Sequence, residues 1–373
     1  MNPRSATPGR ILPFRRFLRC LAAVLAAALC SCQPSAPPPA TAPQPLAREL
    51  VLYDWEGDIP AAVLDQFQRE YGVKVRYEVY ESQEDAMANI RAGRVYDVFV
   101  LESRFLPEMT RDRLLAELDY RNIPNHKNLA PNFRDLVSDP GNRHNVPFNW
   151  GLTGLVVRTD LARRPVTSWA DLWDPRYRGK VGLWMGIHRD VIALTLKSLG
   201  FSANSESPAE LEAALGRLLE LKPHALALED FDPDTSAQAL ADGKVAVSMG
   251  YAKDYRVGRE KNKAVAFVVP KEGALLWNDS LVIPASSPNR HTGEVFLNYL
   301  LRPDISAKIT NEKGYPSANE AAVPFVEPSI RNDPVLYPPQ EVLKGAEVIL
   351  PLHPEGVRRY EDLWRRFEAR ASR

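Results

Sequence analysis

Residues 49–80 have the sequence ELVLYDWEGDIPAAVLDQFQREYGVKVRYEVY, and this stretch decides the fold class. Residues 49–53 form a short apolar run typical of a buried strand, and residues 73–80 alternate between polar and apolar side chains as a strand does. Between them, Val63, Phe67 and Tyr71 recur at helical spacing. The stretch therefore predicts a β-α-β unit.

The same alternation continues along the chain. Further helices are expected over residues 82–92, 208–221, 235–242, 292–301 and 354–371, and further strands over residues 96–101, 245–250 and 265–269. This order predicts an α/β fold in which a mostly parallel sheet is covered by helices on both faces. Ligands of such sheets bind beyond the carboxyl ends of the strands and at domain junctions. The segments to examine are therefore residues 54–58, 102–105, 250–253 and the loop expected around Trp277.

The first 31 residues have the pattern of an export signal. Five arginines and no acidic residue precede or enter an apolar run over residues 20–29, which is too short to span a bilayer. All three cysteines of the chain, Cys20, Cys30 and Cys32, lie in or just after this region. Residues 1–31 are therefore predicted to be a signal peptide.

The sequence Leu29-Cys30-Ser31-Cys32 resembles a bacterial lipobox, in which a small residue directly precedes the lipidated cysteine. Ser31 meets that condition for Cys32, whereas Leu29 before Cys30 is a poor cleavage residue. Cys32 is the expected lipidation site, and the alternative is an ordinary cleaved signal in which Cys32 carries no lipid.

Residues 32–47 combine this cysteine with a proline-rich tether, QPSAPPPATAPQPLA. Repeated proline removes the amide donors that a helix or sheet needs, so the tether should be an extended, semi-rigid spacer. It would hold a globular body outside the cytoplasm and near a membrane.

Composition restricts what that body can be. No cysteine follows Cys32, which excludes an internal disulfide and a thiolate metal site. The remaining length predicts two domain-sized units. The full chain has 47 Lys+Arg and 47 Asp+Glu, so removal of five leader arginines leaves a mature net charge of −5, which argues against a nucleic-acid partner and suits a cationic ligand.

Motifs that would support catalysis are absent from the sequence. It has no strand-elbow serine motif, no His-Glu-x-x-His, no phosphate loop and no dinucleotide fingerprint, and its six histidines are scattered. Neither a catalytic residue, nor a cofactor, nor a metal site is predicted.

Two tryptophans have acids close behind them: Trp55 precedes Asp58 by three residues, and Trp277 precedes Asp279 by two. A polyamine needs that combination, because its methylenes gain about 0.8 kcal/mol each when buried and its ammonium groups need carboxylate partners. A cation over an aromatic face adds roughly 0.5 to 2 kcal/mol. The alternative is that both tryptophans are core residues and both aspartates cap helices or turns.

From Leu50 to Leu363 the chain resembles the spermidine/putrescine-binding proteins of bacterial ABC uptake systems. The matching stretches are LYDWEGDIP (52–60), YDVFVLES (96–103), NVPFNWGLTGL (145–155), TSWADLWDPRYRGKVGL (167–183), PKEGALLWNDSLVIP (270–284), FLNYLLRPDISAKI (296–309), GYPSANEAA (314–322) and RNDPVLYPP (331–339). The resemblance implies a two-lobed periplasmic binding protein whose ligand cleft lies between α/β lobes. One lobe would comprise residues 48–151 plus 278–323, and the other residues 152–277 plus 324–373.

The resemblance also implies ligand-binding residues. Trp55 and Trp277 match walls of the ligand slot, and Asp279 matches the carboxylate that faces an inner amine. Tyr251 stands where the family usually has a tryptophan, and Tyr315 matches a cleft tyrosine. A further acid, Asp190, matches the partner of a terminal ammonium; its alternative is a solvated helix position.

Five positions depart from the family pattern. Ile187 replaces an acid, Asp58 replaces a tyrosine, and Ile349 replaces an amide. Glu102 and Arg104 occupy a polar and an aromatic position of the family. Asp58 and Glu102 would then reposition the ammonium partners. Arg104 would be neutralised by Glu102, or bind a ligand carboxylate, or form a local pair with Glu102 or Glu108 at the cleft rim.

These observations predict a monomeric, membrane-anchored solute receptor that closes on a small organic cation and presents it to an ABC permease and ATPase. It would be neither an enzyme nor a nucleic-acid-binding protein. Two alternatives stay open. One is the same fold binding an amino-acid zwitterion, thiamine or ferric ion, the last disfavoured because no Tyr-Tyr pair occurs. The other is a sensory or structural lipoprotein not involved in transport.

Overall fold

A ten-stranded sheet runs through the computed structural model, which describes residues 44–162, 164–228 and 233–369. Eight strands follow the order β2-β1-β3-β9-β4-β7-β5-β6, while β10 pairs with β9 and β8 with β4. The strands are β1 (Glu49–Asp54), β2 (Lys74–Val79), β3 (Val98–Glu102), β4 (Asn145–Arg158), β5 (Val181–Trp184), β6 (Ala225–Leu228), β7 (Val247–Tyr251), β8 (Val265–Val268), β9 (Leu275–Val282) and β10 (Glu347–Val348).

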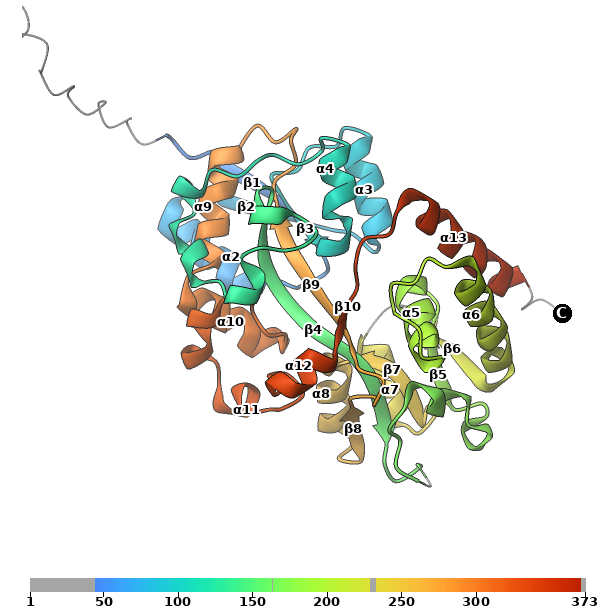
Figure 1. Ribbon diagram of the computed structural model, residues 1–373. Helices are drawn as coiled ribbons and strands as arrows, with labels where there is room; N and C mark the ends of the chain where they lie inside the picture. The colour runs from blue at the N-terminus through green and yellow to red at the C-terminus, as the bar shows by residue number, and fades with distance from the viewer. Residues whose placement is uncertain (1–43, 163, 229–232, 370–373) are drawn as a thin grey trace, which may run out of the picture. The chain divides into compact units, whose positions relative to one another are not determined.

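The sheet is parallel towards its two ends and antiparallel in its middle. The pairs β1-β2, β1-β3, β5-β6 and β5-β7 are parallel, whereas β9 runs antiparallel to β3 and β4, and β4 runs antiparallel to β7. The described helices are α2 (Ala61–Tyr71), α3 (Gln83–Arg91), α4 (Leu106–Arg111), α5 (His188–Ser198), α6 (Pro208–Leu221), α7 (Pro233–Ala241), α8 (Ala252–Lys261), α9 (Arg290–Leu300), α10 (Pro303–Lys313), α11 (Pro328–Arg331), α12 (Gln340–Gly345) and α13 (Pro354–Ala369). Figure 1 shows these helices packed around the sheet, so the predicted α/β class is confirmed.

The predicted β-α-β unit is confirmed. Strands β1 and β2 pair in parallel with Glu49 opposite Lys74, and α2 between them buries Val63 and Phe67. Helix α3 begins where expected, because the side chain of Ser82 accepts a hydrogen bond from a backbone amide in its first turn. The signal, the lipobox and most of the tether lie outside the described residues.

The largest hydrophobic clusters of the described residues lie in two regions along the sheet. The first core, made of two clusters, draws on residues 50–148 and 281–318, around β1, β3 and α9. The second core draws on residues 155–275 and 349–367, around β5, α5, α6 and α13. Smaller clusters lie beside them, and one of these joins Ala252 of α8 to Ala307 of α10 and Ile330 of α11.

Strands β4 and β9 connect these two cores. Along β4, Val146 belongs to the first core and Leu155 to the second; along β9, Leu281 belongs to the first and Leu275 to the second. The two strands run side by side as the long green and orange ribbons of Figure 1. Both strands therefore contribute residues to both cores.

The pairing of β4 with β9 is interrupted between Pro147 and Trp150. There the segment Pro316–Ala318 takes over: Trp150 N donates to the carbonyl of Pro316 at 3.1 Å, and Ala318 N donates to that of Phe148 at 2.9 Å. These hydrogen bonds hold the segment Pro316–Ala318 against β4. They thereby also fix the position of Tyr315, which directly precedes the segment.

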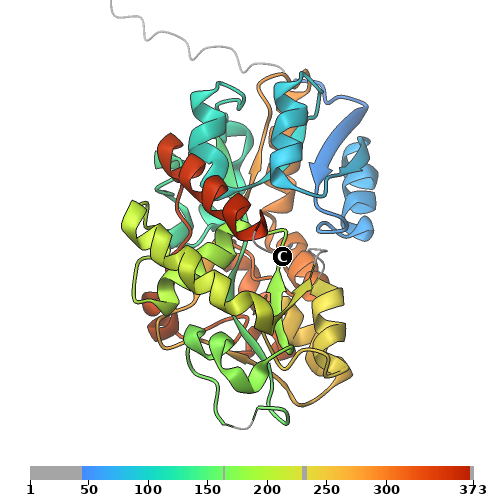
Figure 2. The ribbon, with the colours of Figure 1, turned by 90° about the vertical axis from the view of Figure 1, so that its right-hand side faces the viewer.

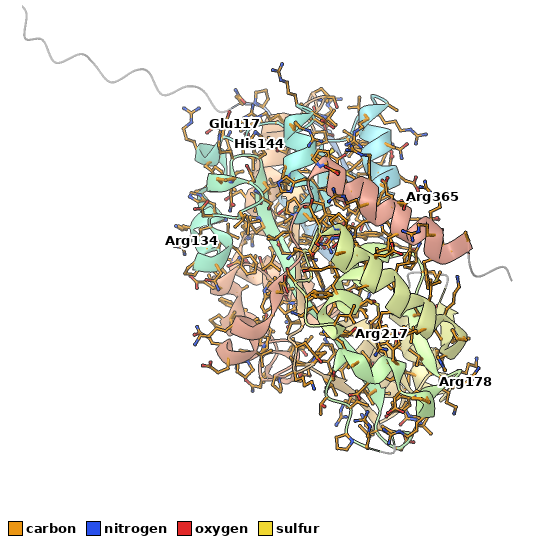
Figure 3. The ribbon with its side chains drawn as sticks, turned by 45° about the vertical axis from the view of Figure 1, so that its right-hand side comes forward. Glu117, Arg134, His144, Arg178, Arg217 and Arg365 are labelled. Atoms are coloured by element: carbon orange, nitrogen blue, oxygen red, sulfur yellow. The ribbon has the colours of Figure 1, made fainter. Side chains whose placement is uncertain are left out.

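Helices α6 and α13 cover the second core on one side and lie next to each other in Figure 2. Arg366 of α13 reaches Glu212 of α6 at 2.8 Å, and Arg365 lies at the outer edge of the molecule in Figure 3. The guanidinium of Arg217 lies 4.6 Å from the ring centroid of Trp173. Across the described ranges, no helix combines the length and the apolar character that crossing a membrane would need.

Candidate ligand-binding site

An arginine lies between two acids where the two cores meet. Arg104 belongs to η1 (Ser103–Phe105), directly after β3, and its Nη2 lies 2.9 Å from Oε2 of Glu102. Its Nη1 lies 3.4 Å from Oδ1 of Asp190, in the first turn of α5. The exposed fractions of the three side chains are 14 % for Arg104, 18 % for Glu102 and 8 % for Asp190, so this group is largely removed from solvent.

Two predictions about this group are resolved. Arg104 does form the expected pair with Glu102, whereas Glu108 pairs with Arg91 instead. The alternative of a solvated Asp190 is wrong, because Arg104 covers its carboxylate and only 5 % of the residue is exposed.

Asp279 lies beside this group on β9, directly opposite Glu102 on β3. Opposed residues of neighbouring antiparallel strands have side chains within contact range. Burial raises the pKa of Asp279 well above its ordinary value, and repulsion from Glu102 and Asp58 raises it further. The residue is 7 % exposed, and no hydrogen bond or ion pair joins its carboxylate to any described residue. A buried carboxylate without a cationic partner is stabilised when a cation binds beside it.

The segment around Trp277 was predicted to be a loop, which is wrong: residues 275–282 form β9. The sequence of β9 lacks the alternation of polar and apolar residues that indicates a strand, because Asn278, Asp279 and Ser280 are polar although buried. Ser280 is satisfied by Ser103 at 2.8 Å and by Asn145 at 3.0 Å, so polar partners on β4 and η1 replace the apolar ones expected for a central strand.

Three aromatic rings meet at Trp277, which lies two residues before Asp279 and on the same face of β9. Trp277 makes edge-to-face contacts with Tyr251 at 5.6 Å and with Tyr315 at 5.4 Å between ring centroids. Gly151 on β4 lies beneath the indole, and a Cβ built on it would be only 2.5 Å from Cζ2 of Trp277. Within the described residues, the buried Nε1 of Trp277 and Oγ1 of Thr153 have no hydrogen-bond partner. These are polar positions that a ligand could satisfy.

A second group of charged residues consists of Asp58, Lys253 and Lys313. Burial raises the pKa of Asp58 to about 6, while the ammonium groups of Lys253 and Lys313 act in the opposite direction. Asp58, Lys313 and Tyr315 line a small pocket with space for roughly one water molecule.

Trp55 follows β1 and packs on Tyr80, with ring centroids 4.6 Å apart. Both Trp55 and Trp277 are partly buried. Trp55 packs against the first core, as the alternative of core tryptophans expects, whereas Trp277 belongs to none of the hydrophobic clusters of the described residues. The alternative of capping aspartates is wrong: Asp279 lies inside a strand, and α2 after Asp58 has no side-chain cap.

Ile187 and Ile349, two of the positions that depart from the family pattern, pack in or against the second core. They add apolar surface and no charge.

Sequence reasoning missed three charged residues of the site. Asp54 is fully buried at the end of β1, where its Oδ2 accepts a hydrogen bond from Tyr77 at 3.1 Å. Lys253 lies 5.6 Å from the ring centroid of Tyr315, and Lys313 ends α10 just before that tyrosine. Asp54 and Lys253 fall within the segments that were singled out, whereas nothing in the sequence pointed to Lys313. Among the described residues, no cluster of His, Cys, Asp and Glu could hold a metal ion.

Comparison with known proteins adds the following. The family described as bacterial extracellular solute-binding protein matches residues 62–337. A spermidine/putrescine-binding periplasmic protein of Escherichia coli K12 is 35 % identical over 301 residues, which covers 80 % of this chain and 85 % of the relative. The putrescine-binding periplasmic protein SpuD of Pseudomonas aeruginosa is 34 % identical over 314 residues, covering 79 % and 85 %. The structure of the spermidine/putrescine ABC transporter substrate-binding protein PotD of Streptococcus pneumoniae superposes with a TM-score of 0.77 at 30 % identity, covering 87 % of this chain and all of the other.

Proposed function

Because this chain belongs to the spermidine/putrescine-binding family of bacterial extracellular solute-binding proteins, we propose that it captures a polyamine outside the cytoplasm and delivers it to the permease of an ABC uptake system. The observation that carries this proposal is the carboxylate of Asp279. It is buried, has a raised pKa and has no ion-pair partner among the described residues. An ammonium group would supply the missing charge and hydrogen bonds.

The aromatic rings explain how the rest of a polyamine would be held. Trp277, Tyr251 and Tyr315 surround the position next to Asp279, and Trp55 lies at the end of β1. Their faces can dry the methylenes of the ligand, at about 0.8 kcal/mol for each buried methylene. Ring faces also attract the ammonium groups themselves.

Capture would proceed by closure of two lobes, residues 48–151 plus 278–323 and residues 152–277 plus 324–373. The two hydrophobic cores and the strands β4 and β9 between them support this division. The ligand contacts side chains from both lobes, so it binds the closed form more tightly than the open one. That difference in affinity is what shifts the hinge equilibrium and signals occupancy to the permease.

The same site gives no support to catalysis, because its groups bind and enclose a cation without presenting an activated nucleophile. We therefore propose that the ligand leaves chemically unchanged. The protein would act as a monomer, with the mature chain attached to a membrane through a lipid on Cys32 and the proline-rich tether as slack.

The test is a thermal-shift screen of the full mature protein, followed by calorimetric titration of every hit. The ligands are putrescine, spermidine, spermine, thiamine and a set of amino acids. A ligand present at 100 times its Kd stabilises the folded state by about 2.7 kcal/mol, which such a screen detects. Stabilisation by at least one polyamine, recovered unchanged by mass spectrometry, is expected. Stabilisation by thiamine or an amino acid alone would refute the proposal.

A further inference from the structure

We infer that Arg104 is a resident cation that takes the place of one ligand ammonium, so that the cleft selects diamines over longer polyamines. This inference rests on the proposed function and names its ligand class more narrowly. It follows from the contacts of Arg104 and from the charges around Asp279.

Asp190 is already paired with a cation of the protein. Arg104 Nη1 lies 3.4 Å from its carboxylate, and Glu102 shares the same guanidinium at 2.9 Å. A ligand ammonium arriving at Asp190 would have to displace a guanidinium fixed to the protein. That competition lowers the affinity of any ligand that needs a cation at this end.

The surroundings of Arg104 disfavour a ligand carboxylate. Arg104 faces two carboxylates, so the three groups together carry one formal negative charge, and the neighbouring Asp279 makes it two. A third carboxylate, brought by a zwitterion, would meet like charges in a largely buried place. Arg104 therefore does not serve as an anion receptor here.

Asp58, which also acts on Asp279, has cations of the protein near it as well. Lys253 and Lys313 act on Asp58, and Lys253 also lies over the ring of Tyr315. Ammonium groups of the protein thus already attend this second acid. The ligand's own charges are confined to the surroundings of Asp279.

The three cations of the protein already have acids beside them: Arg104 lies between Glu102 and Asp190, and Lys253 and Lys313 act on Asp58. Asp279 is left as the carboxylate without an ion-pair partner among the described residues. A diamine brings one ammonium to Asp279 and only one more to place, whereas each further ammonium of a triamine or tetramine has to compete with a cation of the protein.

The experiment compares putrescine, spermidine and spermine by calorimetry at about pH 8 on the mature wild-type protein and on four variants. Arg104→Ala frees both acids and opens space, and Arg104→Gln removes the charge with less change in volume. Arg104→Lys keeps the charge. Arg91→Ala is the matched control, because Arg91 also pairs with two acids, Glu108 and Asp112, but on the exterior.

The wild type should bind putrescine more tightly than spermidine. In Arg104→Ala and Arg104→Gln the ratio of the two dissociation constants should shift towards spermidine by about tenfold or more, while Arg104→Lys and Arg91→Ala keep the wild-type ratio. An unchanged ratio in the folded Ala or Gln variant, or a wild type that prefers spermidine, would overturn the inference and leave polyamine binding intact. A wild type that binds no polyamine would overturn the proposed function as well.

Discussion

Nη1 of Arg104 and Oδ1 of Asp190 lie 3.4 Å apart, although 86 residues separate the two in the chain. Arg104 lies two residues after β3, whose Val100 belongs to the first core, whereas Asp190 directly precedes Val191 of the second core. The pair therefore joins segments of the two cores. If the cores move as the two proposed lobes, this pair favours the arrangement in which they meet, with or without a ligand.

Replacing Asp190 by Ala should shift the ligand-free protein towards an open form. A hydrogen-bonded, largely buried charge pair contributes about 1.5 to 3 kcal/mol. Its loss therefore lowers the equilibrium constant between closed and open forms by roughly tenfold or more. Small-angle X-ray scattering of the ligand-free protein should record a larger radius of gyration. Asp112→Ala removes an exterior partner of Arg91 and should leave the scattering unchanged. Identical curves for wild type and Asp190→Ala would show that the pair does not bias the hinge.

Replacing Gly151 by Ala should weaken ligand binding through Trp277. The added methyl would meet the indole at 2.5 Å, so the ring must move from its position between Tyr251 and Tyr315. Overpacking of this kind destabilises by about 1 to 3 kcal/mol.

The control for this substitution is Gly216→Ala on α6, where an added Cβ meets nothing within 4 Å. It should raise stability by about 0.5 to 1 kcal/mol, as Gly to Ala does inside a helix, and leave affinity unchanged. The measurements are thermal unfolding and tryptophan fluorescence titration. Wild-type affinity in Gly151→Ala would mean that the indole position does not matter for binding.

Affinity for a polyamine should rise with pH between about 5.5 and 8. Burial raises the pKa of Glu102 to about 7, against the opposing effect of Arg104, and raises that of Asp58 to about 6, against Lys253 and Lys313. A bound ammonium favours the ionised carboxylates, so binding releases protons and strengthens as these groups ionise.

The expected gain is at least about tenfold across this range, measured by calorimetry in buffers of different ionisation enthalpy. Glu102→Gln should flatten the upper part of the profile, near pH 7, and retain the lower part. Affinity that falls as pH rises would contradict the assignment of these carboxylates to cation binding.

The fold was largely predictable because most of its elements carry regular patterns. The β-α-β unit over residues 49–80 is an example, and α6 was predicted with the bounds that it has. The strand β4 was not predicted. It is buried along its whole length and contains Pro147, Gly151 and Gly154, which are typical of loops. Both glycines are needed because aromatic rings, Trp277 and Phe267, lie directly on the strand.

The site was less predictable, since its central contacts join distant segments. That Arg104 meets Asp190 depends on how two bodies close, and no local pattern records it. Lys313 belongs to the site through its place at the end of α10, next to Tyr315. By contrast, Asp58 and Asp279 could be singled out as candidates because each stands close to a tryptophan, which is a local signal.

Membrane attachment should depend on Cys32 and not on Cys30. In cells that export the full chain, Cys32→Ala should move the protein from the membrane pellet to the soluble fraction and abolish labelling with a radioactive fatty acid. Cys30→Ala is the matched control and should remain attached and labelled. Soluble wild-type protein without label would indicate an ordinary cleaved signal.

The most direct test of the account is calorimetric titration of Asp279→Asn with putrescine and spermidine. Asparagine keeps the size of the side chain and removes its charge, and losing the partner of a buried ammonium weakens binding by about 2 to 5 kcal/mol. The account predicts at least about a thirtyfold loss of affinity for both ligands, with a melting temperature equal to or above that of the wild type because an unpaired buried carboxylate is removed. Asp112→Asn, on the exterior, should bind as the wild type does. Wild-type affinity in folded Asp279→Asn would contradict the central claim that this carboxylate holds the ligand.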